Sequence, residues 1–200
     1  MRPAMAAGDL LETPLGEILD TLAGEGPAPG GGSVAAIVVA MSAGLVTMVA
    51  RASKEHWSEA GGVVGQAEAF RARVAPLAQA DAEVYTAALA ALKGREQVEA
   101  RYRDQKLQAA LERAAEIPLK IAEAGSDLTC LAALLVENGN PEVRADAAAA
   151  SVLAEGGTRA AAKLVEINLG ATEEDPRVRH VRLLVDVAAE ASTRALAAAQ

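Results

Sequence analysis

The stretch Pro27-Ala28-Pro29-Gly30-Gly31-Gly32-Ser33 stands directly before an uncharged apolar run, Val34 to Ala50. The prolines disfavour helix in the approach, and serine is a good helix N-cap. We therefore expect Ser33 to cap a central helix that spans the apolar run. Bare glycine backbone at a helix start can hold an anion or a carbonyl. On spacing alone, the glycines fit equally well a buried helix that begins beneath close neighbours.

The composition indicates a helical core built from small side chains. Apolar residues make up 52% of the 200 residues, but aromatic residues only 2%. Alanine, valine, leucine and isoleucine must then form the core, and alanine is the strongest helix former. A chain of this length buries a sizeable core in one domain. We therefore expect a single helical domain over residues 1–200.

Charge and residue counts exclude several classes of partner. The net charge of −8 argues against a nucleic-acid partner. Cys130 is the one cysteine, and neither His56 nor His180 has a partner at metal-ligand spacing. The sequence therefore predicts no disulfide and no metal site.

The run Val34 to Ala50 is also the one candidate membrane span. Its 17 residues are at the lower limit for a span, and Ser42, Gly44 and Thr47 dilute it. The residues before it lack the usual design of a signal peptide. A buried central helix is the better interpretation, in a cytoplasmic protein with no membrane partner.

Periodicity and helix-stop residues divide the rest of the chain into helices. Thr13-Pro14 predicts a helix start with Thr13 as its cap. Asn138-Gly139-Asn140 predicts a stop, with Gly139 left-handed and Asn140 capping the next helix. The longer expected segments are Val63 to Leu92 with a kink at Pro76, Gln97 to Glu137 with a kink at Pro118, Pro141 to Leu169, and a last helix from Thr172. No stretch alternates with period two. The expected fold is all-α, a bundle of about six or seven mostly antiparallel helices, some long and kinked.

Asp81 is the most informative polar residue. It lies between Leu77 and Tyr85 on an otherwise apolar stripe. A carboxyl group on a packed face needs a partner, a proton or a function. It either caps or pairs with a neighbouring helix, or it carries protons in a reaction.

Several short stretches together resemble the cyclodeaminase/cyclohydrolase family of folate enzymes. The resemblance covers residues 13 to 170. The stretches that carry it occur in the family's order: PAPGGGSVAA over 27–36, Asp81-Ala82 with Tyr85, Ile117-Pro118-Leu119, Gly139-Asn140 with Asp146, and Ile167-Asn168-Leu169. It implies an all-helical, dimeric protein that acts on the one-carbon bridge between N5 and N10 of tetrahydrofolate. The reaction is a methenyltetrahydrofolate cyclohydrolysis or a formimidoyltetrahydrofolate cyclodeamination, and no cofactor is expected.

The resemblance also assigns site residues. Asp81 matches the family's conserved aspartate and is the expected general acid/base. The expected substrate-binding residues are Gly30, Gly31, Gly32, Ser33, Arg51, Lys54, Asn140 and Asp146. Arg51 and Lys54 do not belong to the matched motifs and are candidates for binding the glutamate tail of the folate. The alternative is a non-catalytic folate-binding or scaffold dimer derived from this family.

Two further expectations concern assembly and spacing. Ala36, Ala40 and Gly44 share one helix face, which together with the resemblance predicts a homodimer. Asp146 and Asn168 lie on one stripe but about 33 Å apart along a straight helix. We therefore expect Asp146 to belong to the site and Asn168 to be structural or to serve across a subunit boundary.

One segment departs from the family pattern. After the central helix, the family has a threonine, then a glycine and a run of basic residues, whereas this chain has Ser53-Lys54-Glu55-His56-Trp57. Ala145 and Leu164 also replace a usual serine and asparagine. These positions predict altered contacts to folate.

Overall fold

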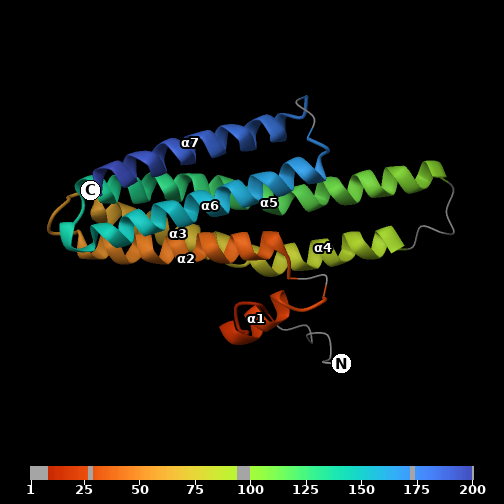
Figure 1. Cartoon of the computed structure of the whole chain (residues 1–200), viewed down its shortest axis with the longest axis horizontal. Helices are drawn as coiled ribbons and strands as arrows, with labels where there is room; N and C mark the ends of the chain where they lie inside the picture. Colours follow the sequence, from red (N-terminus) through yellow and green to blue (C-terminus); the bar gives the residue numbers. More distant parts are fainter. Residues whose placement is uncertain (1–8, 27–28, 94–99, 172–173, 200) are drawn as a thin grey trace.

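The computed structural model describes residues 9–26, 29–93, 100–171 and 174–199, and it is all-α over these ranges (Figure 1). No strand occurs in the described ranges. The elements are α1 (Leu15–Leu22), α2 (Gly31–Ala52), α3 (Ala60–Val74), α4 (Leu77–Lys93), α5 (Ala100–Asn138), the 3-10 helix η2 (Pro141–Val143), α6 (Arg144–Asn168) and α7 (Pro176–Ala198). The predicted all-α bundle is confirmed.

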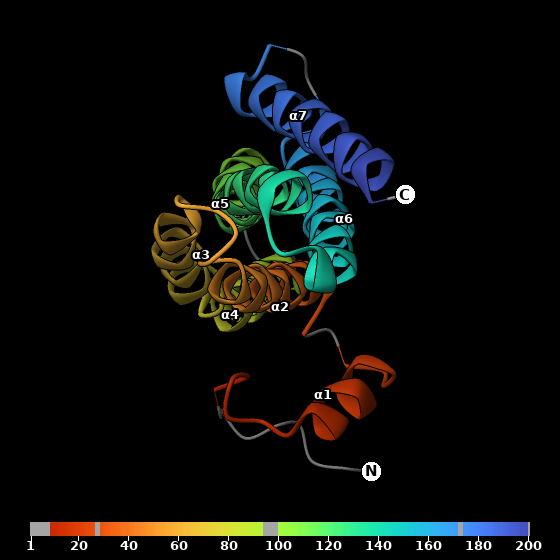
Figure 2. The same ribbon diagram turned by 90° about the vertical axis from the view of Figure 1, so that its left-hand side faces the viewer.

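Two long helices organise the bundle, as the end-on view shows (Figure 2). The helix α5 packs against α4, α6 and α7, and α2 packs against α3, α4 and α6. The helix α1 stands apart from the bundle and packs extensively against no other described helix. The central position of α2 agrees with the interpretation of its apolar sequence.

Small residues let the long helices approach closely. A Cβ atom added to Gly157 of α6 would overlap Val39 of α2, and one added to Gly125 of α5 would overlap Thr158 of α6. The three largest fully buried side chains, Ile121, Leu128 and Leu135, come from α5. An alanine-rich core of this kind needs close backbone approach, because alanine and valine fill little volume.

Several predicted boundaries shift by a few residues. The helix α2 begins at Gly31 with Gly30 as its N-cap, so the prediction that Ser33 is the cap is wrong. Likewise Pro14, not Thr13, is the N-cap of α1. The last helix begins at Pro176 behind the cap Asp175, whose carboxylate accepts from the Arg177 N–H, whereas Thr172 lies outside the described residues.

The two internal prolines have different effects. The helix is interrupted between Val74 and Leu77, so the segment expected to kink at Pro76 is two helices, α3 and α4. In contrast, α5 continues through Pro118 over 39 residues. The difference matters for the site, because an internal proline leaves one helical carbonyl without its usual donor.

Gly139 is required for a reason other than the predicted one. Within the described residues, positive φ angles occur only at Gly170 and Ala171. A Cβ atom at Gly139 would lie 2.5 Å from the Leu135 carbonyl oxygen and 2.7 Å from the Ser53 Oγ. The close approach of the Leu135 carbonyl in α5 and of the Ser53 hydroxyl just after α2 therefore demands glycine here, not left-handed backbone. The predicted cap Asn140 is confirmed, since its side chain accepts from the Glu142 N–H at 2.9 Å.

The outward face of α2 differs from the expected one. Ala36 is fully buried inside the subunit, so it cannot contact a second subunit. The exposed apolar residues of α2 are instead Met41 and Met48, at 52% and 40% exposure, with Gly44 partly exposed between them. By length and composition alone α2 also qualifies as a membrane span, but over half of it is buried inside the subunit.

Candidate active site

Asp81 reaches from α4 to the first turn of α2. Its Oδ2 accepts a hydrogen bond from the Ser33 hydroxyl at 3.1 Å, and the Ser33 backbone N–H donates to the same carboxyl group. Ser33 is the third residue of α2, so the carboxylate satisfies one of the free N–H groups at a helix start. The positive end of the helix dipole also favours a carboxylate there. The side chain that caps α2 thus comes from another helix.

One of the three glycines makes room for this carboxylate. A Cβ atom at Gly32 would overlap the Asp81 carboxyl group. At Gly31 the nearest atom is Leu164 Cδ1 at 4.0 Å, and nothing lies within 4 Å at Gly30. Gly32 is therefore the position that the Asp81 contact requires, whereas Gly30 and Gly31 have open space beside them.

Burial raises the pKa of the Asp81 carboxyl above its ordinary value, although the hydrogen bonds from Ser33 act in the opposite direction. Desolvation disfavours the charged form of an acid. Among the residues that the structure describes, no lysine or arginine contributes to the shift. Asp81 therefore combines a partly desolvated carboxyl group with hydrogen bonds that hold its position.

A cavity of about 190 Å³ opens beside this carboxyl group. Its walls come from the start of α2, from α4, and from the middle of α5 and the end of α6. The lining residues are Gly30, Gly31, Gly32, Asp81, Val84, Tyr85, Ala114, Pro118, Leu164 and Asn168. Tyr85 lies one helical turn after Asp81 and is 44% exposed, so it offers an aromatic face at the cavity. The N–H groups of Gly31 and Gly32 have no acceptor within α2.

Asn168 and Pro118 are linked at the wall of this cavity. In a regular helix the Ala114 carbonyl would accept from the N–H of residue 118, but proline has none. The Asn168 side chain takes that place, with Nδ2 donating to the Ala114 oxygen at 3.0 Å. The amide is thereby held in one orientation, and its Oδ1 has no hydrogen-bond partner among the described residues. An acceptor is left at the cavity wall.

The other expected binding residues lie near the far end of α2. Arg51 is in the last turn of α2 and pairs with Glu68 of α3, and Lys54 is exposed just beyond it. From Gly31 to Ala52, α2 rises about 32 Å. Within one subunit, Arg51 and Lys54 are therefore far from Asp81.

Asn140 and Asp146 also belong to the far end. The Asn140 backbone N–H donates to the Ser53 Oγ at 2.9 Å, and Asn140 Nδ2 donates to the Ala52 carbonyl at 3.3 Å. These bonds fasten the turn before α6 to the C-terminal end of α2. Asp146 is exposed in the first turn of α6. The structure therefore does not bring these two residues to the cavity of the same chain.

The sequence predicts that Asn168 is structural or serves across a subunit boundary. The structure gives it a structural hydrogen bond to Ala114 and also places it at the cavity wall beside Asp81. The available signal was the pair Pro118 and Asn168. An internal proline frees a carbonyl, and an asparagine on an apolar face is a candidate to satisfy it. What the sequence does not show is that α5 and α6 lie side by side at these two positions.

The arrangement suits proton transfer. A carboxyl group with a raised pKa can take and return protons nearer neutral pH. Beside it lie N–H donors, an amide acceptor and one aromatic ring. No group of three or more histidine, cysteine, aspartate or glutamate side chains that would hold a metal ion occurs in the described part of the chain.

Comparison with known proteins gives a consistent result. The family model described as formiminotransferase-cyclodeaminase matches residues 14–186. A methenyltetrahydrofolate cyclohydrolase of Methylorubrum extorquens is 34% identical over 172 residues, covering 82% of this chain and 81% of the relative. A formimidoyltransferase-cyclodeaminase of Rattus norvegicus is 33% identical over 174 residues, and the match spans 83% of this chain but 32% of that longer protein.

A solved structure shows the same fold. The crystal structure of a formiminotetrahydrofolate cyclodeaminase from Thermotoga maritima superposes with a TM-score of 0.78 at 24% identity, covering 94% of this chain and 96% of that one. The fold, the extent of the family match and the identity to these relatives agree. The chain belongs to the formiminotransferase-cyclodeaminase family.

Proposed function

We propose that this protein acts on the one-carbon bridge between N5 and N10 of tetrahydrofolate, as a methenyltetrahydrofolate cyclohydrolase or a formimidoyltetrahydrofolate cyclodeaminase. The observation that carries the proposal is the Asp81 carboxyl group, partly desolvated at a cavity beside the glycine-rich start of α2. The activities named for the relatives support it.

Asp81 serves as the general acid/base in either reaction. In cyclohydrolysis, water adds to the methenyl carbon and loses a proton, and the bond from that carbon to N5 breaks as N5 is protonated. In cyclodeamination, N10 attacks the formimino carbon and loses its proton, while the departing nitrogen gains protons and leaves as ammonia. A single carboxyl group can accept the first proton and return it to the leaving nitrogen. Proton transfer accompanies every bond made or broken, and neither reaction changes an oxidation state, so we expect no cofactor.

The cavity wall supplies groups that suit a pterin. The Tyr85 ring is a flat apolar surface on which a pterin ring can stack. The Asn168 Oδ1 accepts from an N–H on the edge of the pterin, because its Nδ2 is already bonded to the Ala114 carbonyl. The N–H groups of Gly31 and Gly32 bind a substrate carbonyl or carboxylate oxygen.

A second copy would complete the site. Arg51, Lys54, Asn140 and Asp146 lie too far from Asp81 to serve the same cavity within one chain. We propose a homodimer whose two α2 helices run antiparallel, so that the C-terminal end of one α2 meets the glycine-rich start of the other. The exposed Met41 and Met48 on α2 support an apolar contact between the copies. Arg51 and Lys54 of the second copy would then hold the glutamate tail of the folate.

A non-catalytic, folate-binding or scaffold dimer is the second candidate. It is favoured by the hydrogen bonds from Ser33 to Asp81, because they would give Asp81 a structural role as the cap of α2. Both candidates keep the fold and the cavity, and they differ only in turnover.

The decisive experiment follows the absorbance of 5,10-methenyltetrahydrofolate with the pure protein. For a cyclohydrolase, we expect enzyme-dependent loss of the methenyl signal in buffer and its return from 10-formyltetrahydrofolate. For a cyclodeaminase, the signal should rise from 5-formimidoyltetrahydrofolate, and added ammonia should oppose it. Saturable folate binding without any of these changes would support the non-catalytic dimer.

A further inference from the structure

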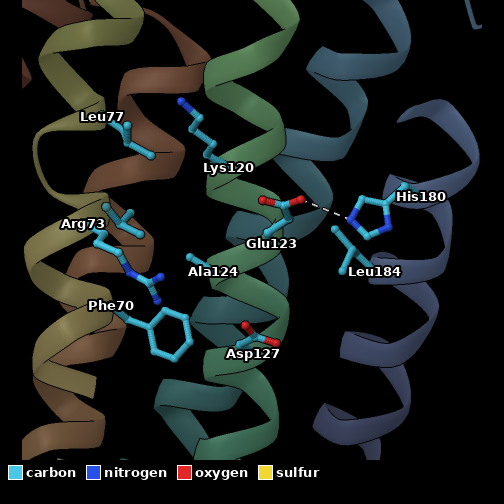
Figure 3. Close-up of a pocket in the computed structure, with 10 residues that line it drawn as sticks. Phe70, Arg73, Leu77, Lys120, Glu123, Ala124, Asp127, His180 and Leu184 are labelled. Carbon is cyan, nitrogen blue, oxygen red and sulfur yellow. Dashed lines mark hydrogen bonds and ion pairs between the residues drawn. The ribbon is translucent and has the colours of Figure 1, made fainter. Parts of the chain in front are cut away.

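A second and larger cavity, of about 520 Å³, lies on another side of the bundle. It opens between α3, α5 and α7, and it shares no lining residue with the cavity beside Asp81 (Figure 3). The lining residues are Phe70, Arg73, Val74, Leu77, Lys120, Glu123, Ala124, Asp127, His180 and Leu184. The folate chemistry proposed above uses none of them.

Unpaired charges of both signs face this cavity. The Arg73 guanidinium lies 4.7 Å above the centre of the Phe70 ring and points toward α5, which carries Asp127 (Figure 3). Neither Arg73 nor Asp127 forms an ion pair with any residue in the described ranges. Several other arginines in the chain do, such as Arg51 with Glu68 and Arg194 with Glu137.

Arg73 and Asp127 interact electrostatically across the cavity without forming an ion pair. Burial raises the pKa of the Asp127 carboxyl, and the positive charge of Arg73 lowers it. The two groups are thus within electrostatic range but not in contact. A ligand that carries both charges can bridge such a gap, because each of its ends meets an unpaired opposite charge.

The other residues that line the cavity indicate the chemistry of the rest of the ligand. Val74, Leu77, Ala124 and Leu184 supply apolar surface between the charged groups. Glu123 is already held by His180, with its Oε1 at 3.2 Å from the histidine Nε2. Lys120 lies one turn before Ala124 on α5 and adds a second cation on the side of Leu77 (Figure 3).

We propose that this cavity binds a free aliphatic α-amino acid, with its carboxylate at Arg73, its ammonium group at Asp127 and its side chain on the apolar wall. A cavity of several hundred Å³ suits a small molecule rather than a protein surface. Two charge-assisted contacts fix the orientation of the ligand, and the stacking of Arg73 on Phe70 holds one of them in place. The site is independent of the proposed folate reaction.

The test compares L-leucine with two analogues that each lack one of its charged groups, by calorimetric titration and thermal shift with the full chain. L-leucine carries both charges, 4-methylpentanoate lacks the ammonium group, and isopentylamine lacks the carboxylate. Leucine should bind about tenfold or more tightly than either analogue, since each lost contact is a hydrogen bond between charged groups. Equal binding of all three, or no binding of leucine, would overturn the proposal.

Single substitutions then test which residue of the cavity contacts each charged group of leucine. R73Q removes the contact with the carboxylate, so leucine should then bind no more tightly than isopentylamine. D127N removes the contact with the ammonium group, so leucine should then bind no more tightly than 4-methylpentanoate. The matched controls are R71Q on α3 and D186N on α7, which are exposed and outside the cavity lining. If the controls weaken leucine binding as much as R73Q and D127N, the ligand binds elsewhere and the proposal fails. Folate turnover measured on the same variants reports on the other cavity separately.

Discussion

At the residue scale, the proposed activity depends on one contact between α2 and α4. Asp81 accepts hydrogen bonds from Ser33 because Gly32 leaves space for its carboxyl group. The same contact anchors the start of α2 and exposes a partly desolvated acid to a cavity. The Asp81 side chain therefore both stabilises the start of α2 and carries protons in the proposed reaction. Substitutions must separate these two roles.

Gly32→Ala should disrupt the site. The added methyl group overlaps the Asp81 carboxyl group, so Asp81 must turn away from the start of α2. General acid–base catalysis typically contributes a factor of about 10² to 10⁴ to the rate. We therefore expect turnover to fall roughly 10²-fold or more. The matched control is Gly156→Ala inside α6, where nothing lies within 4 Å of the added atom and a helical alanine should add about 0.5 to 1 kcal/mol of stability. If the two variants lose turnover equally, the space at Gly32 is not what the site requires.

Asp81 should also make stability depend on pH. Because its pKa is higher in the folded protein than its ordinary value, its contribution to stability is fully present below the unfolded pKa, about 3.9. That contribution is lost as the pH rises through the folded pKa. Asp81→Asn removes this titration, so the melting temperature of the variant minus that of the wild type should be greater at pH 7 than at pH 3.5. A difference that shrinks from pH 3.5 to pH 7 would show that the carboxylate form is the stabilised one.

At the element scale, the notable feature is a helix that continues through a proline. The Ala114 carbonyl of α5 loses its helical donor at Pro118, and Asn168 of α6 supplies another. This bond joins the two helices at the wall of the cavity. It explains in physical terms why an asparagine stands at the end of α6.

A double-mutant cycle tests that link. Asn168→Ala leaves the Ala114 carbonyl without a donor and should cost about 1 to 3 kcal/mol in the free energy of unfolding. In a Pro118→Ala background the N–H of residue 118 bonds the same carbonyl, so Asn168→Ala should cost clearly less. Chemical denaturation of the four proteins measures the coupling. Equal costs in both backgrounds would mean that Asn168 does not compensate for the proline.

Most of the elements could be predicted from the sequence, and their ends could not. Apolar periodicity locates the long helical segments, because core faces repeat with the helical period, but it merges α3 and α4 into one. The caps of α1 and α2 were misplaced because a cap depends on which groups lie near the first turn. For α2 that group is Asp81, 48 residues later in the chain. The sequence predicts Gly139 from backbone angle, whereas the close contacts with the Leu135 carbonyl and with the Ser53 hydroxyl, distant in the sequence, require it.

The candidate site was predicted in part. The glycine stretch and Asp81 do meet at one cavity, as the resemblance implied. Asn168 was assigned away from the site because distance along α6 separates it from Asp146. That distance is real, but Asn168 is the residue near Asp81, since α6 ends where α2 begins. Sequence spacing gives the distance between two residues along one helix. It does not show which end of a neighbouring helix packs beside each of them.

At the scale of the whole molecule, two groups of expected site residues lie at opposite ends of α2. Gly30 to Ser33 and Asp81 are at one end, and Arg51, Lys54, Asn140 and Asp146 are near the other. An antiparallel homodimer would join the two groups at each of two equivalent sites. In this arrangement the exposed side of α2 is the contact between copies.

Substitution on α2 tests the assembly. Met41→Glu places a charge on the exposed side of α2 and should give a monomer by light scattering at micromolar concentration, with helical circular dichroism unchanged. The matched control is Leu183→Glu on α7, which is similarly exposed at 58% against 52% for Met41 and should leave the dimer intact. A wild-type protein of monomeric mass, or a Met41→Glu protein that is still dimeric, would contradict this arrangement.

The central claim is that Asp81 transfers protons at a folate site. The most direct measurement is turnover of Asp81→Asn in the methenyltetrahydrofolate absorbance assay, with folate affinity measured on the same preparation. The amide retains the shape and a hydrogen bond at the start of α2 but cannot transfer the proton. We predict a fall in kcat of about 10² to 10⁴, with folate binding and melting temperature largely retained. Near-normal turnover per folded molecule, together with a lower melting temperature, would show that Asp81 is only the cap of α2.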